Sequence, residues 1–120
     1  MTFFVTGEQF GVRLVTRSGF LNLWLIVGHE PADDLEIKQC AHAHGEPRAA
    51  EGGVRAAVSS AAEEVNRTFG TSYWPWNVEF QTDDPASAPS LLREAASAVF
   101  RRLATRAASD FAGTADDDAR

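Results

Sequence analysis

The stretch Phe20-Leu-Asn-Leu-Trp-Leu-Ile-Val-Gly28 is the most apolar run in the chain, and its alternation decides the fold. In an extended strand, successive side chains point to opposite faces of the sheet. One face of this stretch is wholly aliphatic and carries Leu21, Leu23, Leu25 and Val27. The other face is mixed and carries Phe20, Asn22, Trp24 and Ile26. We therefore expect a strand with one face in the core and the other available for function.

A second alternating stretch, residues 10–17, precedes the first across Ser18-Gly19. Two strands separated by two residues, one of them a glycine able to adopt positive φ, indicate a β-hairpin. A two-residue loop would place Arg17 opposite Phe20 and Arg13 opposite Trp24, whose ring the guanidinium could cover. The face with the leucines then also contains Phe10, Val12 and Leu14 and is wholly apolar. The mixed face also contains Gly11, Arg13, Val15 and Arg17.

Residues 35–43 also alternate and predict a third strand. Its core side carries Leu35, Ile37, Gln39, Ala41 and Ala43. Its other side carries Glu36, Lys38, Cys40, His42 and His44, which we place beside Arg13, Asn22 and Trp24.

Two helices and another strand complete the pattern. Residues 51–69 have helical spacing, and Gly70 stands where a left-handed C-cap belongs. Residues 74–82 alternate, which puts Trp74 and Trp76 on the buried side and leaves Tyr73 as the more exposed aromatic. A second helix is expected from Ser87 or Ser90 to about residue 108.

These elements predict an α+β fold, a two-layer sandwich in which two helices pack on one face of a mainly antiparallel sheet of four to five strands. The element order is β-β-β-α-β-α, with residues 2–6 as an optional extra N-terminal strand. We expect residues 1–111 to form a single domain and residues 112–120, which are small and acidic, to be a disordered tail.

Composition narrows the class of partner. The chain of 120 residues has a formal net charge of −6, which disfavours nucleic acid because phosphate binding depends on clustered Lys and Arg. No apolar run approaches the roughly 20 residues needed to span a bilayer. A single cysteine and a start without a basic segment followed by an apolar one favour a cytoplasmic protein.

Three side chains on one strand, Cys40, His42 and His44, are candidate metal ligands, because thiolate and imidazole suit zinc or copper. The sequence shows no matching second group of ligands. We favour a polar strand surface over a metal site, and we expect no cofactor.

Two helices can cover one face of the sheet but not both, so the mixed face is the candidate site. Our first hypothesis is a non-enzymatic binding or regulatory module that uses this face for homodimerisation or for a protein partner. The alternative is a small-molecule-binding protein or enzyme with a pocket around Trp24, Arg13 and His42. The candidate binding residues are Arg13, Arg17, Phe20, Asn22, Trp24, Ile26, Lys38, His42 and Tyr73.

Overall fold

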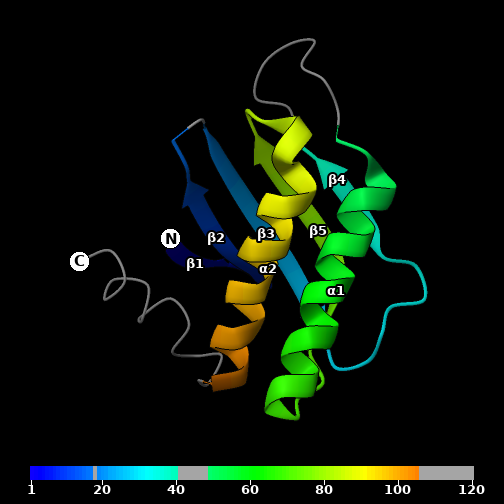
Figure 1. Cartoon of the computed structure of the whole chain (residues 1–120). Coiled ribbons are helices and arrows are strands. Elements are labelled where there is room, and N and C mark those ends of the chain that lie inside the picture. Colours follow the sequence, from blue (N-terminus) through cyan, green and yellow to red (C-terminus); the bar gives the residue numbers. More distant parts are fainter. Residues whose placement is uncertain (18, 41–48, 106–120) are drawn as a thin grey trace.

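The computed structural model describes residues 1–17, 19–40 and 49–105 and has the predicted α+β architecture (Figure 1). The predicted order is confirmed, and the optional N-terminal strand is present. The elements in chain order are β1 (Thr2–Thr6), β2 (Gln9–Val15), β3 (Phe20–Gly28), β4 (Glu36–Gln39), α1 (Glu51–Phe69), β5 (Trp74–Thr82), the 3-10 turn η1 (Pro85–Ser87) and α2 (Ala88–Thr105).

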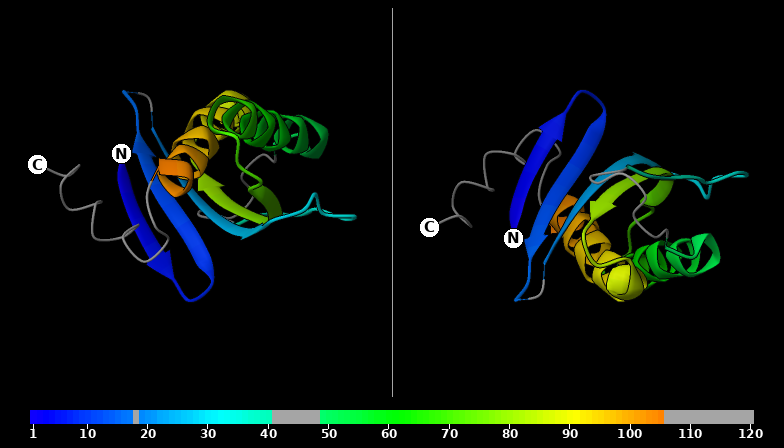
Figure 2. Two further views of the ribbon diagram at one scale, coloured as in Figure 1. Left: turned by 90° about the horizontal axis from the view of Figure 1, so that it is seen from below. Right: turned by 90° about the horizontal axis from the view of Figure 1, so that it is seen from above.

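The five strands form one sheet in the order β1-β2-β3-β5-β4, with β3 at its centre. Neighbouring strands are antiparallel except β4 and β5, which are parallel. Parallel neighbours need a long crossover, and α1 supplies it by leading from the β4 side of the sheet to β5. Both helices lie on the same face of the sheet (Figure 2).

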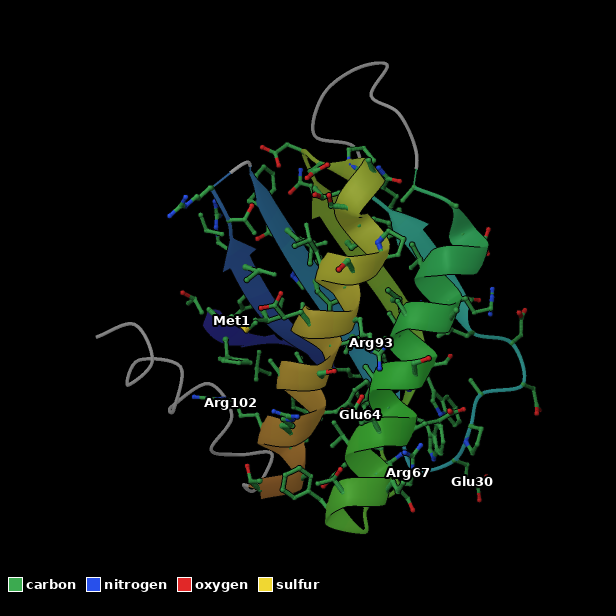
Figure 3. All side chains as sticks on the ribbon, viewed as in Figure 1. Met1, Glu30, Glu64, Arg67, Arg93 and Arg102 are labelled. Atoms are coloured by element: carbon green, nitrogen blue, oxygen red, sulfur yellow. The ribbon has the colours of Figure 1, made fainter. Side chains whose placement is uncertain are left out.

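The core lies between that face and the helices. Leu21, Leu23 and Leu25 of β3 are fully buried, as the alternation predicts. The other large buried side chains come from neighbouring strands and from both helices, and they include Val12, Val78, Phe80, Val54, Val58, Val65, Leu92, Val99 and Phe100. Between the helices, Arg93 of α2 forms a 3.1 Å ion pair with Glu64 of α1 (Figure 3).

The hairpin register differs from the predicted one by two residues. Arg13 lies opposite Asn22, and Trp24 lies opposite Gly11. The connection is longer than two residues: β2 ends at Val15, β3 begins at Phe20, and the Thr16 amide donates to the Gly19 carbonyl at 2.7 Å. Because side chains repeat every two residues, the shift leaves each one on its predicted face and changes only its neighbours.

A contact distant in sequence explains this longer turn. The Asp83 carboxylate accepts a hydrogen bond from the Phe20 amide at 2.8 Å. It also occupies the space that a Cβ on Gly19 would need. Gly19 therefore leaves room for this carboxylate, and it does not adopt positive φ, which among the described glycines is found at Gly7 and Gly70.

The prediction that both Trp74 and Trp76 face the core is wrong for Trp76. Pairing between β3 and β5 shifts after Ile26, so that Val27 lies opposite Pro75 and Trp76 is the extra residue of a bulge. Pro75 has no amide hydrogen for the ladder, which favours an irregularity at this point. Trp76 is 47% exposed, and its indole donates to the Glu30 carbonyl at 2.7 Å. Trp74 is half-buried against the core.

β4 is shorter than the stretch predicted from residues 35–43. It ends at Gln39, although the Cys40 amide still donates to the Phe80 carbonyl at 2.7 Å. His42 and His44 lie outside the described residues, as does the predicted acidic tail.

The helix predicted over residues 51–69 is confirmed with its C-cap. Gly70 has a φ of 66°, and its amide donates to the Asn66 carbonyl at 2.8 Å. A Cβ added to Gly70 would meet no atom within 4 Å. The glycine is therefore needed for its backbone conformation and not for space.

The substitution Gly70→Ala should lower the free energy of unfolding by about 1 kcal/mol, because an L side chain is strained at positive φ. Gly52→Ala is the matched control, since Gly52 lies within α1 and its added Cβ also meets no atom within 4 Å. This second change should raise the free energy of unfolding by about 0.5–1 kcal/mol. Urea unfolding of both variants measures these two changes. If both variants changed the free energy of unfolding in the same direction, Gly70 would not be needed for its backbone conformation.

Candidate functional site

The candidate site is the face of the sheet opposite the helices, which we call the outer face. Figure 2 shows this side of the sheet turned away from α1 and α2. The strand registers place the following residues on it: Thr2, Phe4, Thr6, Gln9, Gly11, Arg13, Val15, Phe20, Asn22, Trp24, Ile26, Glu36, Lys38, Asn77, Glu79 and Gln81. The outer face therefore collects most of the residues that the alternation assigned to the mixed surface.

An aromatic pair lies near the middle of the outer face. The ring centroids of Phe4 and Trp24 are 6.1 Å apart, and the planes meet at 64°, the edge-to-face geometry that aromatic rings favour. Gly11 lies between their strands, and the Phe4 ring occupies the space that a Cβ on Gly11 would need. Gly11 thus lets Phe4 lie flat across β2 towards Trp24.

Phe4 was not among the residues predicted for this face from the sequence. The first strand was only an optional element, so its pairing with β2 had no basis in the pattern. The sequence does show that Phe3 and Val5 would lie on one face of a strand and Phe4 on the other. Only the β1–β2 register shows which of these faces is the outer one.

Arg13 does not stack on Trp24, in contrast to the prediction. The two-residue shift of the hairpin brings its guanidinium carbon to 5.5 Å from the centroid of the Phe20 ring. This is within the range of a cation–π contact. Beside it, Val15 is 66% exposed, which is a large fraction for an aliphatic residue on a strand.

The β5 and β4 side of the outer face is polar. The side-chain amide of Asn22 donates to the Gln81 side-chain oxygen at 3.4 Å, and the side-chain amide of Asn77 donates to the Glu36 carboxylate at 3.2 Å. Glu79 lies between Trp24 and Lys38 in the strand register. The outer face therefore has an apolar half over β1, β2 and β3 and a charged half over β5 and β4.

The structure brings together Arg13, Phe20, Asn22, Trp24, Ile26 and Lys38 on this face. Arg17 is exposed in the turn that follows β2. Tyr73 lies apart: it is half-buried against the core, and its ring centroid is 5.5 Å from that of His29. Asn66 holds the Tyr73 backbone through two hydrogen bonds, so Tyr73 belongs to the helix–strand connection.

Cys40 is half-buried at the end of β4. Burial raises the pKa of its thiol, the negative charge of Glu79 raises it further, and Lys38 opposes the shift. Among the described residues, no group of three acidic, histidine or cysteine side chains could hold a metal ion. The metal hypothesis also involves His42 and His44, which lie outside the described part of the chain.

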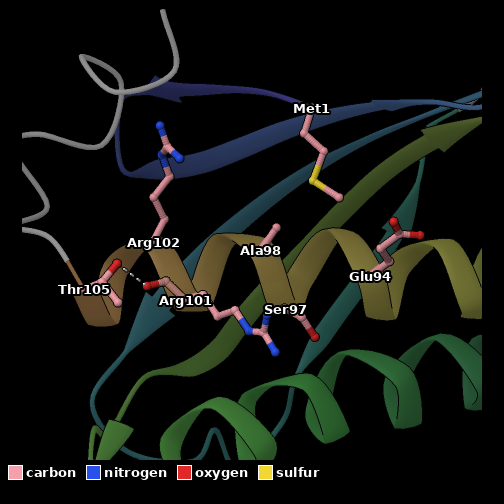
Figure 4. A pocket seen from close by; sticks show the side chains of 7 residues that line it. All are labelled: Met1, Glu94, Ser97, Ala98, Arg101, Arg102 and Thr105. Carbon is pink, nitrogen blue, oxygen red and sulfur yellow. Dashed lines mark hydrogen bonds between the residues drawn. The ribbon is translucent and has the colours of Figure 1, made fainter. Parts of the chain in front are cut away.

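A groove of about 530 Å³ lies on the helix side of the sheet (Figure 4). It is lined by Met1 and by one face of α2, and Arg101 and Arg102 leave that helix in different directions. The Arg102 guanidinium carbon lies 4.1 Å from the centroid of the buried Phe3 ring. The groove is therefore separated from the outer face by the sheet itself.

Comparison of the chain with protein-family models, with curated proteins and with solved structures finds no match. Within the described ranges, neither helix is long and apolar enough to cross a membrane.

The environment of Cys40 leads to a test by thiol alkylation. Because its pKa is raised, Cys40 should react more slowly at pH 7.5 than in the unfolded chain, and the midpoint of its pH–rate profile should lie higher. Glu79→Gln removes a charge that disfavours the thiolate and should speed the reaction. Lys38→Gln removes a charge that favours it and should slow the reaction. Changes in the opposite directions would show that these two charges do not control the thiol.

Proposed function

We propose that the protein is a non-enzymatic protein-binding or regulatory module whose outer face is the binding surface. The observation that carries the proposal is an apolar cluster on the face that neither described helix covers. In this cluster Phe4, Phe20, Trp24 and Ile26 are half-buried, and Val15 is exposed. A protein partner is the occupant that we favour, and a second copy of the chain is the alternative.

The composition of the cluster supports a macromolecular partner. Binding energy at protein interfaces is concentrated in a few residues, among which Trp and Arg are enriched. Trp24 and Arg13 both lie on the outer face, each beside a phenylalanine ring. Polar side chains on β5 and β4 border this centre, and an apolar centre with a polar rim is the usual arrangement of an interface.

The small-molecule alternative has less support. It required Arg13 to point towards Trp24, whereas the guanidinium lies by Phe20. Its third residue, His42, is outside the described part of the chain. The 530 Å³ groove lies on the helix side, and neither Arg13 nor Trp24 lines it.

Two substitutions on the outer face should weaken binding. Trp24→Ala removes the largest apolar side chain at its centre, and Val15→Lys puts a charge at an exposed apolar position. Each should reduce partner capture from the native host by at least about tenfold, the loss expected at an interface hot spot. Capture is measured by quantitative mass spectrometry of protein bound to the immobilised chain.

Phe69→Lys is the matched control, because Phe69 is also exposed, at 42%, but lies at the end of α1. It should leave capture unchanged. Circular dichroism must show that all three variants fold. If folded Trp24→Ala and Val15→Lys both retain the same partner, and both self-associate as the unsubstituted chain does, the outer face is not the binding surface.

A further inference from the structure

β1 is the outermost strand of the sheet, and on the side away from β2 no described strand pairs with it. We call this side the β1 edge. Exposed edges usually carry charges, proline or bulges that prevent pairing with another chain. The sequence of β1, Thr2-Phe-Phe-Val-Thr6, has no charged residue, proline or glycine. It therefore lacks the sequence features that keep an edge strand from pairing with another strand.

The sequence of β1 is also nearly palindromic about Phe4. In an antiparallel pair of two copies centred on Phe4, each Thr2 faces Thr6 of the other copy. Each Phe3 faces Val5, and the two Phe4 residues face each other. Thr–Thr and aromatic–β-branched pairs are among the cross-strand combinations that stabilise antiparallel sheets. Four of the five positions of β1 thus form such pairs when the strand pairs with itself, and Phe4 is the central position.

We propose that two copies of the chain associate through their β1 edges in this antiparallel register and form one continuous sheet. The two-fold axis is perpendicular to the sheet, because only this direction pairs a strand with its own copy side by side in an antiparallel sense. In the proposed register the axis passes midway between the two Phe4 residues. The helices of both copies then lie on the same side. This inference does not depend on the occupant of the outer face.

The burial of β1 side chains fits the proposal on both faces. On the helix side, Phe3 is 7% exposed, whereas Val5 is 40% exposed. Pairing covers each Val5 with Phe3 of the other copy. α2 packs over β2 and β3, so β1 extends beyond the helix layer, and no other helix or strand of the described residues covers its edge (Figure 2).

On the other side of the sheet, pairing joins the two outer faces. Phe4 contacts Trp24 within one copy, because its ring lies across β2 and away from the edge, so only the backbones of the two Phe4 residues flank the axis. The two Phe4–Trp24 pairs then lie on one continuous outer face shared by both copies. Edge pairing therefore doubles the apolar surface without covering it.

Substitutions that introduce charges at both ends of β1 test the proposed register. Thr2 and Thr6 are both exposed, so neither is needed for the core. The double variant Thr2→Glu with Thr6→Glu places like charges opposite each other at both ends of the paired strands. The double variant Thr2→Glu with Thr6→Lys places opposite charges there. The two variants share Thr2→Glu and differ only in the sign of the charge at position 6.

By analytical ultracentrifugation, we expect the unsubstituted chain to have twice the mass of one chain. The Glu/Glu variant should dissociate with a Kd raised by at least about tenfold, and the Glu/Lys variant should remain dimeric. Val15→Lys, on β2 of the outer face, should also remain dimeric. A monomeric unsubstituted chain, or equal Kd values for the two double variants, would overturn the inference. Dissociation by Val15→Lys but not by Glu/Glu would assign self-association to the outer face instead.

Disulfide formation gives an independent test of register in a Cys40→Ser background. A mixture of Thr2→Cys and Thr6→Cys chains should form a cross-linked pair, because these positions face each other across the axis. Thr2→Cys chains alone should form at most a trace of the cross-linked pair. In this register, position 2 of one copy faces position 6 of the other, so the two cysteines are four residues apart along the strand. Equal cross-linking in the mixture and in Thr2→Cys alone would overturn the register.

Discussion

Two helices can cover only one face of a five-stranded sheet, and the rest of the molecule follows from this constraint. The leucines of β3 supply the centre of the covered face, where Leu21, Leu23 and Leu25 are fully buried. Because strand side chains alternate, burying these residues necessarily turns Phe20, Asn22, Trp24 and Ile26 the other way. β3, from Phe20 to Gly28, thus contributes both to the core and to the surface that we propose for binding.

The fold was predictable where the signal was local. The bounds of α1 follow from its apolar spacing and from Gly70, whose positive φ ends the helix. The faces of β2 and β3 follow from a period of two, and a register shift of two residues leaves them unchanged. Strong local periodicity therefore predicts the layers and the core without knowledge of which strands pair.

Features that depend on distant contacts were not predictable in the same way. The turn at residues 16–19 is set partly by Asp83, which is more than 60 residues away in sequence. The contact of Arg13 with Phe20 instead of Trp24 is a consequence of that turn. Likewise, Trp76 is exposed because the ladder between β3 and β5 is interrupted beside Pro75. The sequence thus identified the candidate surface but not the neighbours within it.

Contact of the outer face with another protein in the cell can be tested by site-specific photo-crosslinking. A benzophenone amino acid would replace Val15, which is 66% exposed on the outer face, or Phe69, which is 42% exposed at the end of α1. After irradiation of the native host, position 15 should give a discrete adduct that Trp24→Ala abolishes, and position 69 should give none. An adduct from position 69 with none from position 15 would contradict the claim.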